Sequence, residues 1–391
     1  MRGSIFTPVL VGGSLILLIG FAIRAAFGVF QIPIASEFDW PRAEFSLALA
    51  IQNLAWGIGQ PIFGALAEKI GDRRAIVLGA LAYAAGLLLS AGATTPVEHQ
   101  LYEIIVGFGV AGTGFGVILA VVGRAAKPEH RSMSLAIATA AGSAGQVVGP
   151  LVAEGLLAFL SWQAVFVVFA AAITASLALL PLLKAPVQAQ KAVLEESMGT
   201  IVKRAFKDPS YALIFIGFFS CGYQLAFVTA HFPAFVAEVC GPIAADGALA
   251  AMGITTTSAL GALAISVVGL ANIVGTLLAG YLGNLFPKKY LLAAIYAGRT
   301  MIAAWFILTP MTPFTVLVFS ALMGALWLAT VPLTSGLVAQ LYGVRYMGTL
   351  YGIVFFSTSL AASWVSGSAG GCTISMGRTI WSGGSASVSA R

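Results

Sequence analysis

Long segments without charged residues are the feature that most restricts how this chain can fold. Such segments extend from Ala75 up to Glu98, from Ser132 to Ala153 and from Pro209 to Ala237. Each is close to, or longer than, the ~20 residues that an α-helix needs to cross ~30 Å of hydrocarbon. Charged residues make up only 9% of the chain, whereas a soluble domain carries about 25%. The sequence therefore predicts an all-α membrane protein and excludes a water-soluble fold.

Apolar windows bounded by charged residues, Pro and Gly predict the number of spans. Ten full spans are expected, and an eleventh begins near Tyr346. We interpret the first apolar run as a span and not as a secretory signal, because it is long and no convincing small-residue cleavage site follows it. The ten spans cover residues 6–30, 45–66, 75–93, 101–123, 132–159, 163–183, 210–236, 257–283, 290–309 and 313–337.

The distribution of Lys and Arg predicts the orientation, because these residues are retained on the cytoplasmic side during insertion. With the N-terminus inside, fifteen basic residues lie on the cytoplasmic side and only Arg42 lies outside. We therefore expect the chain in the cytoplasmic (plasma) membrane, with residues 184–209 inside and Cys240 outside. The formal charge of +6 then needs no nucleic-acid partner. The fifteen residues are Arg2, Lys69, Arg73, Arg74, Arg124, Lys127, Arg131, Lys184, Lys191, Lys203, Arg204, Lys207, Lys288, Lys289 and Arg345.

The longest polar connector, residues 184–209, divides the chain into two halves. Residues 1–183 are predicted to form an N-terminal bundle of six helices, and residues 210–356 an incomplete C-terminal bundle. The halves resemble each other, because residues 64–73 align with residues 280–289 after the second span of each half. Parallel repeats of this kind are typical of transporters built from two bundles.

The last segment, residues 357–391, departs from this pattern. It is rich in Ser and Gly, has no long apolar helical face and carries Arg378 where the last span should lie. Codons can be chosen so that a shift by one nucleotide encodes an apolar helix here, so we interpret this tail as frameshifted or mis-sequenced. The chain is then expected to have a stub from about Tyr346, a disordered or weakly placed tail from about Ala361, and poor or no transport activity.

Three short motifs resemble those of the major facilitator superfamily. Residues 64–74, Gly-Ala-Leu-Ala-Glu-Lys-Ile-Gly-Asp-Arg-Arg, resemble its signature between spans two and three, with Glu68 where Asp is usual. Residues 145–150 resemble its glycine-proline signature in span five, and residues 162–166 resemble the aromatic start of span six. The resemblance covers about residues 20–356 and implies a two-bundle fold and secondary transport by alternating access.

The first motif is interpreted as a gate. Gly64 permits close packing, and Asp72 is placed to cap span three, where the helix dipole favours a carboxylate. The adjacent Arg73 and Arg74 are placed to pair across the bundle interface in one conformation; the alternative is a plain basic anchor on the cytoplasmic side. Pro150 is expected to bend span five, because it removes a helical hydrogen bond. The predicted gating residues are Gly64, Glu68, Asp72, Arg73, Arg74 and Pro150.

Two further segments resemble the monocarboxylate and oxalate/formate porter branch of that superfamily. They are residues 36–42, Ser-Glu-Phe-Asp-Trp-Pro-Arg, and residues 221–233. That branch usually holds the substrate carboxylate with an Arg in span eight, a few residues after an Asp or Asn. Here Asn272 is kept, but Thr276 stands at the Arg position. An organic anion is therefore a candidate substrate, but the resemblance does not extend to the Arg that binds it in that branch.

A charge within the bilayer is costly, so each one is a functional hypothesis. Arg24 lies in span one, which lines the central cavity in this superfamily, and is the first candidate for a substrate or coupling residue. The alternative is an Arg that snorkels outward. Aligning Pro33 with Pro233 sets Arg24 against Gln224 across the cavity. Arg299 in span nine is interpreted as structural, paired with a carbonyl or a neighbouring helix.

Uncharged polar residues supply the other candidates. Gln52, Trp56 and Gln60 recur every four residues along span two and share one face, with Asn53 beside it. We interpret this stripe as cavity lining, with interhelical hydrogen bonding as the alternative. The predicted substrate-binding residues are Arg24, Gln52, Asn53, Tyr223, Gln224, Asn272 and Trp327.

Proton coupling requires a titratable group whose exposure changes during transport. No acidic residue is expected at mid-bilayer, because Glu103 and Glu154 fall near the outer ends of spans four and five. Glu154 and then His231 are the candidates for proton coupling, and uniport or exchange is the alternative.

These features predict a secondary active transporter of a small solute, with an organic monocarboxylate as the candidate and a proton or an exchanged anion as the coupling partner. The alternatives are a non-transporting or inactive protein of the same fold and an exporter of a small hydrophobic compound. An enzyme is not expected, because the sequence has no HExxH motif, nucleophile elbow, Walker loop or carboxylate pair. No cofactor or metal is expected, the three cysteines are scattered, and we expect a monomer in the bilayer.

Overall fold

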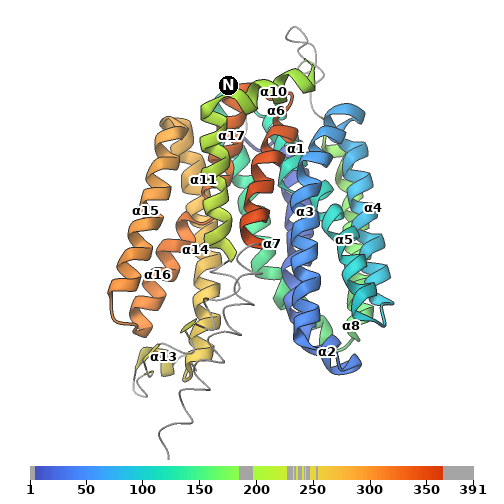
Figure 1. Ribbon diagram of the computed structural model, residues 1–391, viewed down its shortest axis with the longest axis vertical. Coiled ribbons are helices and arrows are strands. Elements are labelled where there is room, and N and C mark those ends of the chain that lie inside the picture. The colour runs from blue at the N-terminus through green and yellow to red at the C-terminus, as the bar shows by residue number, and fades with distance from the viewer. Residues whose placement is uncertain are drawn as a thin grey trace, which may run out of the picture.

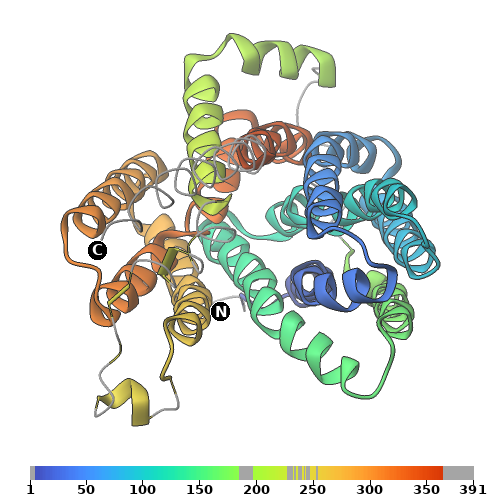
Figure 2. The same ribbon diagram turned by 60° about the horizontal axis from the view of Figure 1, so that its bottom comes forward.

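The computed structural model describes residues 5–184, 197–226 and 254–363, and between the last two ranges residues 232, 235, 236, 240, 241, 243 and 247–251. The described residues form long helices joined by short loops (Figure 1). Viewed toward one end, the helices of the first half lie on one side and those of the second half on the other (Figure 2). The predicted all-α, two-bundle fold is confirmed.

The first bundle begins with a continuous helical segment, Pro8–Phe38. Polar caps start several of its helices: Thr7 Oγ1 accepts from Leu10 N, and Thr95 and Glu98 form a reciprocal capping box. The elements are α1 Pro8–Ala26, η1 Phe27–Phe30, α2 Gln31–Phe38, α3 Arg42–Ile70, α4 Asp72–Ala91, α5 Pro96–Thr113, α6 Phe115–Ala125, η2 Pro128–His130, α7 Arg131–Leu157, α8 Trp162–Ala175 and η3 Ser176–Leu182.

The second bundle follows a short connector helix that ends in basic residues. Asp208 joins this connector to the bundle, because its carboxylate accepts hydrogen bonds from Tyr342 Oη at 2.6 Å and Ser210 N at 2.8 Å. These bonds, first that of Tyr342, hold the pKa of Asp208 below its usual value. The elements are α10 Met198–Lys207, α11 Pro209–Ala226, α13 Ala248–Ala251, α14 Thr257–Leu285, α15 Lys288–Leu308, α16 Pro313–Leu326, α17 Thr330–Tyr342 and a helix over Met347–Ser363, called here the 347–363 helix.

Eight helical segments of the described chain are long and apolar enough to cross a membrane. They correspond to predicted spans one, three to six and eight to ten. The other two predicted spans correspond to α3, which has 29 residues and carries the polar stripe of Gln52 and Gln60, and to α11, which has 18 residues. The prediction of an integral membrane protein is confirmed.

The 347–363 helix is the partial eleventh helix that the sequence predicts from about Tyr346. The sequence places the domain boundary at Phe356 and a weakly placed tail from about Ala361, and the described helix includes residues 357–363. Thr358 Oγ1 donates to the carbonyl oxygen of Phe218 in α11 at 3.0 Å. Hydroxyl side chains can bond a neighbouring membrane helix in this way, so Ser and Thr do not by themselves end a span. The remainder of the predicted tail, residues 364–391, lies outside the described residues.

Glycines bring helices into close contact, as the small-residue pattern predicts. Within the first bundle, a Cβ on Gly149 of α7 would lie 1.9 Å from the carbonyl oxygen of Ala22 in α1. Between the bundles, a Cβ on Gly280 of α14 would lie 2.2 Å from the Cβ of Ala136 in α7. Helices α7 and α14 therefore form part of the surface on which the two bundles meet.

Candidate functional site

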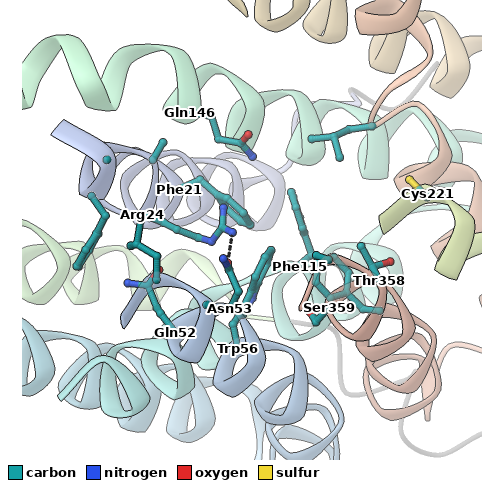
Figure 3. A pocket seen from close by; sticks show the side chains of 18 of the residues that line it. Phe21, Arg24, Gln52, Asn53, Trp56, Phe115, Gln146, Cys221, Thr358 and Ser359 are labelled. Atoms are coloured by element: carbon teal, nitrogen blue, oxygen red, sulfur yellow. Dashed lines mark hydrogen bonds between the residues drawn. The ribbon is translucent and has the colours of Figure 1, made fainter. Parts of the chain in front are cut away.

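A cavity of about 650 Å³ lies between the two bundles, within the range of roughly 300–1,000 Å³ that is usual for small-molecule sites. Figure 3 shows labelled side chains from α1, α3, α6, α7, α11 and the 347–363 helix around it. Its polar lining consists of Arg24, Gln31, Ser46, Gln52, Asn53, Gln146, Cys221, Thr358 and Ser359, and its aromatic lining of Phe21, Phe27, Trp56, Phe115, Phe218, Trp327 and Phe355.

The cavity occupies the half of the molecule that lies away from α10. The first span contributes lining residues from 21 to 31, beyond the middle of α1. Helix α3 runs in the opposite direction and contributes residues 46 to 56, near its start. The 347–363 helix contributes residues 355 to 362, its second half. These segments meet toward the end of the molecule that carries α2, opposite α10 (Figure 1).

Arg24 is held in the cavity wall by two residues of α3. Its Nη2 donates to Asn53 Oδ1 at 2.5 Å, and its Cζ lies 4.2 Å from the ring centroid of Trp56. The second contact is a cation–π interaction, which orients the guanidinium without neutralising it. Arg24 Nε is buried and has no hydrogen-bond partner in the structure. Figure 3 shows Arg24 directed toward Asn53, with Gln146 on the opposite wall.

Among the described residues that line the cavity, Arg24 is the only charged one. Within the described part of the chain, no carboxylate lies within 4.0 Å of its guanidinium. A charge removed from bulk water and left without a counter-ion is costly, and an anion bound beside it offsets that cost. The aromatic lining would contact the apolar part of such an anion. The cavity therefore suits a small anion with an apolar body.

Aromatic rings from both bundles pack together at the end of the cavity that is nearer to α10. The ring centroid of Phe355 in the 347–363 helix lies 4.8 Å from that of Trp56 in α3 and 6.2 Å from that of Phe115 in α6. Just beyond these rings, a Cβ on Gly352 would lie 2.7 Å from the carbonyl oxygen of Gln60. This layer separates the cavity from the end of the molecule near α10.

At that end, α3 contacts the start of the 347–363 helix. Glu68 accepts a hydrogen bond from Thr349 N at 3.0 Å and a second one from Thr349 Oγ1. A carboxylate at the first turn of a helix satisfies a free N–H group and matches the helix dipole. One turn earlier on α3, a Cβ on Gly64 would lie 2.4 Å from the carbonyl oxygen of Gly348, so a larger residue cannot enter. Glu68 and Gly64 thus join the two bundles.

The charges beside this contact are arranged differently from the prediction. Asp72 begins α4 but makes no side-chain cap, and it pairs with Arg124 of α6 at 2.5 Å. Arg124 Nη1 also reaches the carbonyl oxygen of Val344 in the second bundle at 3.5 Å. Arg73 donates to backbone carbonyl oxygens of its own bundle, and Arg74 is exposed. In this conformation Arg124, and not Arg73, reaches across the interface.

The cavity brings together four of the seven predicted substrate-binding residues, namely Arg24, Gln52, Asn53 and Trp327. The other three do not line it. Tyr223 is 60% exposed. Gln224 accepts a hydrogen bond from Arg299 Nη1 at 3.4 Å. Asn272 is buried, where it donates to Ser143 Oγ of α7 at 3.0 Å and accepts from the backbone N–H of Leu328 at 3.0 Å.

The repeat alignment predicts that Gln224 lies across the cavity from Arg24, but Gln224 does not line the cavity and bonds Arg299 instead. Arg299 is 1% exposed and donates to the carbonyl oxygen of Leu326 at 2.7 Å and to that of Trp327. The last carbonyls of a helix lack intrahelical partners, so Arg299 satisfies the end of α16. The predicted pairing of Arg299 with carbonyl oxygens is confirmed.

Among the described residues, Glu154 and Pro150 do not line the cavity. Glu154 is exposed near the end of α7. His231 lies outside the described residues. Pro150 lies inside α7, which continues as one helix from Arg131 to Leu157.

A buried polar cluster lies behind the cavity wall. Glu103 of α5 is 0% exposed and accepts hydrogen bonds from Gln52 Nε2 at 2.6 Å and Ser90 Oγ at 3.1 Å. His99, one turn earlier on α5, places its Nε2 at 3.9 Å from Glu103 Oε1. Because Gln52 also lines the cavity, its amide joins the cluster to the cavity. The spacing of His99 and Glu103 by four residues inside an apolar segment is the sequence signal for this cluster.

Six polar lining residues lie outside the predicted set, namely Gln31, Ser46, Gln146, Cys221, Thr358 and Ser359. Gln146 of α7 is a polar residue inside an apolar segment, so its sequence context could have indicated it. Thr358 and Ser359 lie in the segment that the sequence assigns to the aberrant tail, and the structure places both in the cavity wall. Figure 3 shows them on the 347–363 helix, on the side opposite Arg24.

Comparison with known proteins shows which family and which transporters this chain is similar to. A family model described as Major Facilitator Superfamily matches residues 13–366. The uncharacterized MFS-type transporter YcxA of Bacillus subtilis is 25% identical over 362 residues, which cover 88% of this chain and 82% of YcxA. Multidrug resistance protein MdtH of Yersinia enterocolitica is 29% identical over 239 residues, 59% of this chain and 56% of MdtH. Monocarboxylate transporter 13 of Bos taurus is 30% identical over 145 residues, 37% of this chain and 33% of that protein.

Solved structures show the same fold. The Escherichia coli fucose:proton symporter FucP superimposes with a TM-score of 0.73 at 14% identity, covering 96% of this chain and 94% of FucP. The proton:xylose symporter XylE superimposes with a TM-score of 0.68 at 17% identity, covering 96% of this chain and 89% of XylE. At these identities the likeness establishes the fold and not the solute.

Proposed function

Because this chain belongs to the major facilitator superfamily, we propose that it is a secondary active transporter that carries a small organic anion, with a monocarboxylate as the candidate, by alternating access to the central cavity. This chain is similar to a monocarboxylate transporter over 145 residues, and this partial similarity supports the substrate class. The rest of the support comes from the cavity itself.

The observation that carries the proposal is the state of Arg24. Its guanidinium lines the cavity, is oriented by Asn53 and Trp56 and has no carboxylate within 4.0 Å in the described chain. A guanidinium binds a carboxylate through charge-assisted hydrogen bonds, which are about twice as strong as neutral ones. Arg24 would therefore take over the role that the Arg of span eight has in the porter branch, where this chain has Thr276. Thr276 is buried and bonds Asn272, away from the cavity.

The arrangement of contacts fits the outward-facing state of an alternating-access cycle. The cavity lies in the half away from α10, which we expect to face outward, and the contact of Glu68 and Gly64 with the 347–363 helix closes the opposite half. Release to the cytoplasm would require this contact to break. The residues of the first sequence motif would then act as a gate.

Uptake by proteoliposomes tests the proposal. Purified protein is reconstituted and assayed with radiolabelled formate, lactate, pyruvate, oxalate and succinate, and with fucose and xylose as neutral solutes of similar size. We expect saturable uptake of at least one monocarboxylate and no uptake of the sugars. Uptake of a sugar but of no carboxylate would contradict the assignment of an anion.

A second candidate function is export of a small hydrophobic compound. The aromatic lining favours it, since rings surround the cavity from both bundles, and the similarity to MdtH over 59% of this chain is in line with it. The positive charge of Arg24 disfavours lipophilic cations, so the two candidates separate in one assay. Efflux of a neutral lipophilic dye from loaded proteoliposomes, without carboxylate uptake, would favour the exporter.

A further inference from the structure

The buried cluster around Glu103 has no role in solute binding as described so far. Glu103 is 0% exposed and lies between α3, α4 and α5, with Gln52 and Ser90 as its hydrogen-bond donors. Both donors are neutral, and within the described chain no Lys or Arg lies within 4.0 Å of the carboxyl group. An ionised carboxylate that is buried without a cation is strongly unfavourable. The geometry therefore favours a neutral carboxylic acid in this conformation.

His99 lies on the outer side of Glu103. It is 2% exposed, and its ring is stacked on Phe45 with centroids 5.6 Å apart. Its Nε2 has no hydrogen-bond partner and lies 3.9 Å from Glu103 Oε1. Residues four apart share a face of a helix, so a small movement brings the two groups within hydrogen-bonding distance. An unpartnered buried nitrogen directed at an acid is the arrangement of a proton relay.

The other polar groups around Glu103 do not neutralise it. On α4, Tyr83 is buried, donates to the carbonyl oxygen of Gly20 and interacts electrostatically with both Arg24 and Glu103. On α3, Glu44 bonds Gln100, the residue next to His99, and so adds negative charge at the outer end. The titratable and charged groups that face the cluster are His99 on its own helix, Glu44 on α3, Tyr83 on α4 and Arg24 on α1.

Gln52 connects this cluster to the solute site. Its side-chain amide donates to Glu103 Oε2 at 2.6 Å, and the residue also lines the cavity. The next residue, Asn53, accepts from Arg24. A solute that binds Arg24 and displaces Asn53 would therefore act on the turn of α3 from which Gln52 donates its hydrogen bond to Glu103. Solute binding and the protonation of Glu103 share one structural element.

We propose that Glu103 carries the coupling proton, that His99 delivers it from the outer side, and that Gln52 transmits its state to the solute bound at Arg24. This deepens the function proposed above and rests on it. A proton from outer water binds His99; its Nε2–H bond then breaks as an O–H bond forms at Glu103, which leaves a neutral imidazole and a neutral acid. In the inward-facing state the O–H bond breaks and the proton leaves to cytoplasmic water. One monovalent anion and one proton cross together, so no net charge moves.

The protonation state of Glu103 can be measured without knowing the solute. Infrared spectra of the purified full chain at neutral pH are recorded for the wild type, Glu103→Gln and Glu154→Gln. We expect a protonated-carboxyl C=O band in the wild type that is lost in Glu103→Gln and kept in Glu154→Gln. If the wild type has no such band, or if Glu103→Gln keeps it, the proposal is wrong.

Transport then tests the coupling, with lactate as the first probe and any other transported monocarboxylate of the panel in its place. For a gradient of one pH unit, inside alkaline, one-to-one coupling allows the wild type to accumulate the anion about tenfold. We expect Glu103→Gln to lose this accumulation while exchange of labelled for unlabelled anion continues, and we expect a membrane potential to leave wild-type uptake unchanged. Accumulation by Glu103→Gln equal to the wild type would overturn the proposal. A wild type that transports no acid of the panel would refute the proposed substrate class instead, and the infrared band would still decide the state of Glu103.

Discussion

At the scale of single residues, Arg24 and Arg299 are arginines inside membrane-spanning helices of the described chain, and their surroundings assign them different tasks. Arg24 faces a cavity and is oriented by an amide and an aromatic ring, which leave its charge available. Arg299 donates hydrogen bonds to the carbonyl oxygens at the end of α16 and to Gln224. Both stand out equally in the sequence, because any charge inside an apolar segment does so. Only the contacts distinguish a binding residue from a structural one.

Replacement of Arg24 should remove transport without removing the folded protein. We expect Arg24→Gln to lower the uptake rate of the transported anion at least roughly tenfold, because the loss of one partner of a buried charge pair costs about 2–5 kcal/mol. Arg24→Lys should retain part of the rate, since it keeps the charge but loses the planar contact with Trp56. Uptake and elution from size-exclusion chromatography are measured together, with Lys127→Gln, an exposed residue, as the matched control. Wild-type uptake by Arg24→Gln would refute the role assigned to Arg24.

Replacement of Arg299 should have the opposite effect. Arg299→Ala leaves the carbonyl oxygens of Leu326 and Trp327 buried without donors, which costs about 1–3 kcal/mol for each unsatisfied group. We expect a lower melting temperature in detergent and a lower yield of folded protein. The transport rate per folded molecule should change little. An unchanged melting temperature would show that other groups satisfy the end of α16.

At the scale of helices, the sequence predicts which segments span and which face of α3 is polar. Gln52 and Asn53 could be found because amides in an apolar segment are conspicuous. The aromatic residues that close the cavity, such as Phe355 and Phe115, could not, because they have the composition of ordinary membrane packing. Gln224 was misplaced for a further reason: a repeat alignment gives the position of a residue along a helix but not the rotation of that helix about its axis.

The contact between α3 and the 347–363 helix should control which side of the cavity is closed. In Glu68→Ala, the N–H and hydroxyl of Thr349 lose their acceptor, so we expect a shift toward the inward-facing state. A cysteine introduced as Met347→Cys, a buried site beside the contact, reports this shift. In a background with Cys221, Cys240 and Cys372 replaced by Ser, maleimide should label it several-fold faster in Glu68→Ala than with Glu68 intact. Equal rates would contradict the gating role of Glu68.

At the scale of the whole molecule, two bundles, a cavity between them and one closed end account for the proposed transport cycle. The apolar spans and the short motifs were sufficient to predict the class and family of the fold, because the bilayer admits few architectures. They were not sufficient to predict how far the 347–363 helix extends, since its hydroxyl groups are satisfied by carbonyls of a distant segment, α11. The orientation in the membrane is still a prediction from the distribution of Lys and Arg.

That orientation places Cys240 on the outer side. A membrane-impermeant maleimide added to intact cells should label Cys240, and Cys240→Ser should abolish the labelling. Burial raises the pKa of the Cys240 thiol above its usual value, and the thiolate is the reactive form. Labelling should therefore accelerate as the pH rises from about 7 to about 9. Labelling that occurs only after the cells are lysed would mean that the predicted orientation is wrong.

The central claim is that a small organic anion crosses the membrane by alternating access to the cavity that contains Arg24. Counterflow tests it most directly: proteoliposomes loaded with an unlabelled monocarboxylate of the panel are diluted into a trace of the labelled compound, without any gradient of pH or potential. A carrier that alternates between two sides must concentrate the label transiently above its final level. We predict this overshoot for the wild type and its absence for Arg24→Gln. If no monocarboxylate gives an overshoot with well-folded wild-type protein, the account is contradicted.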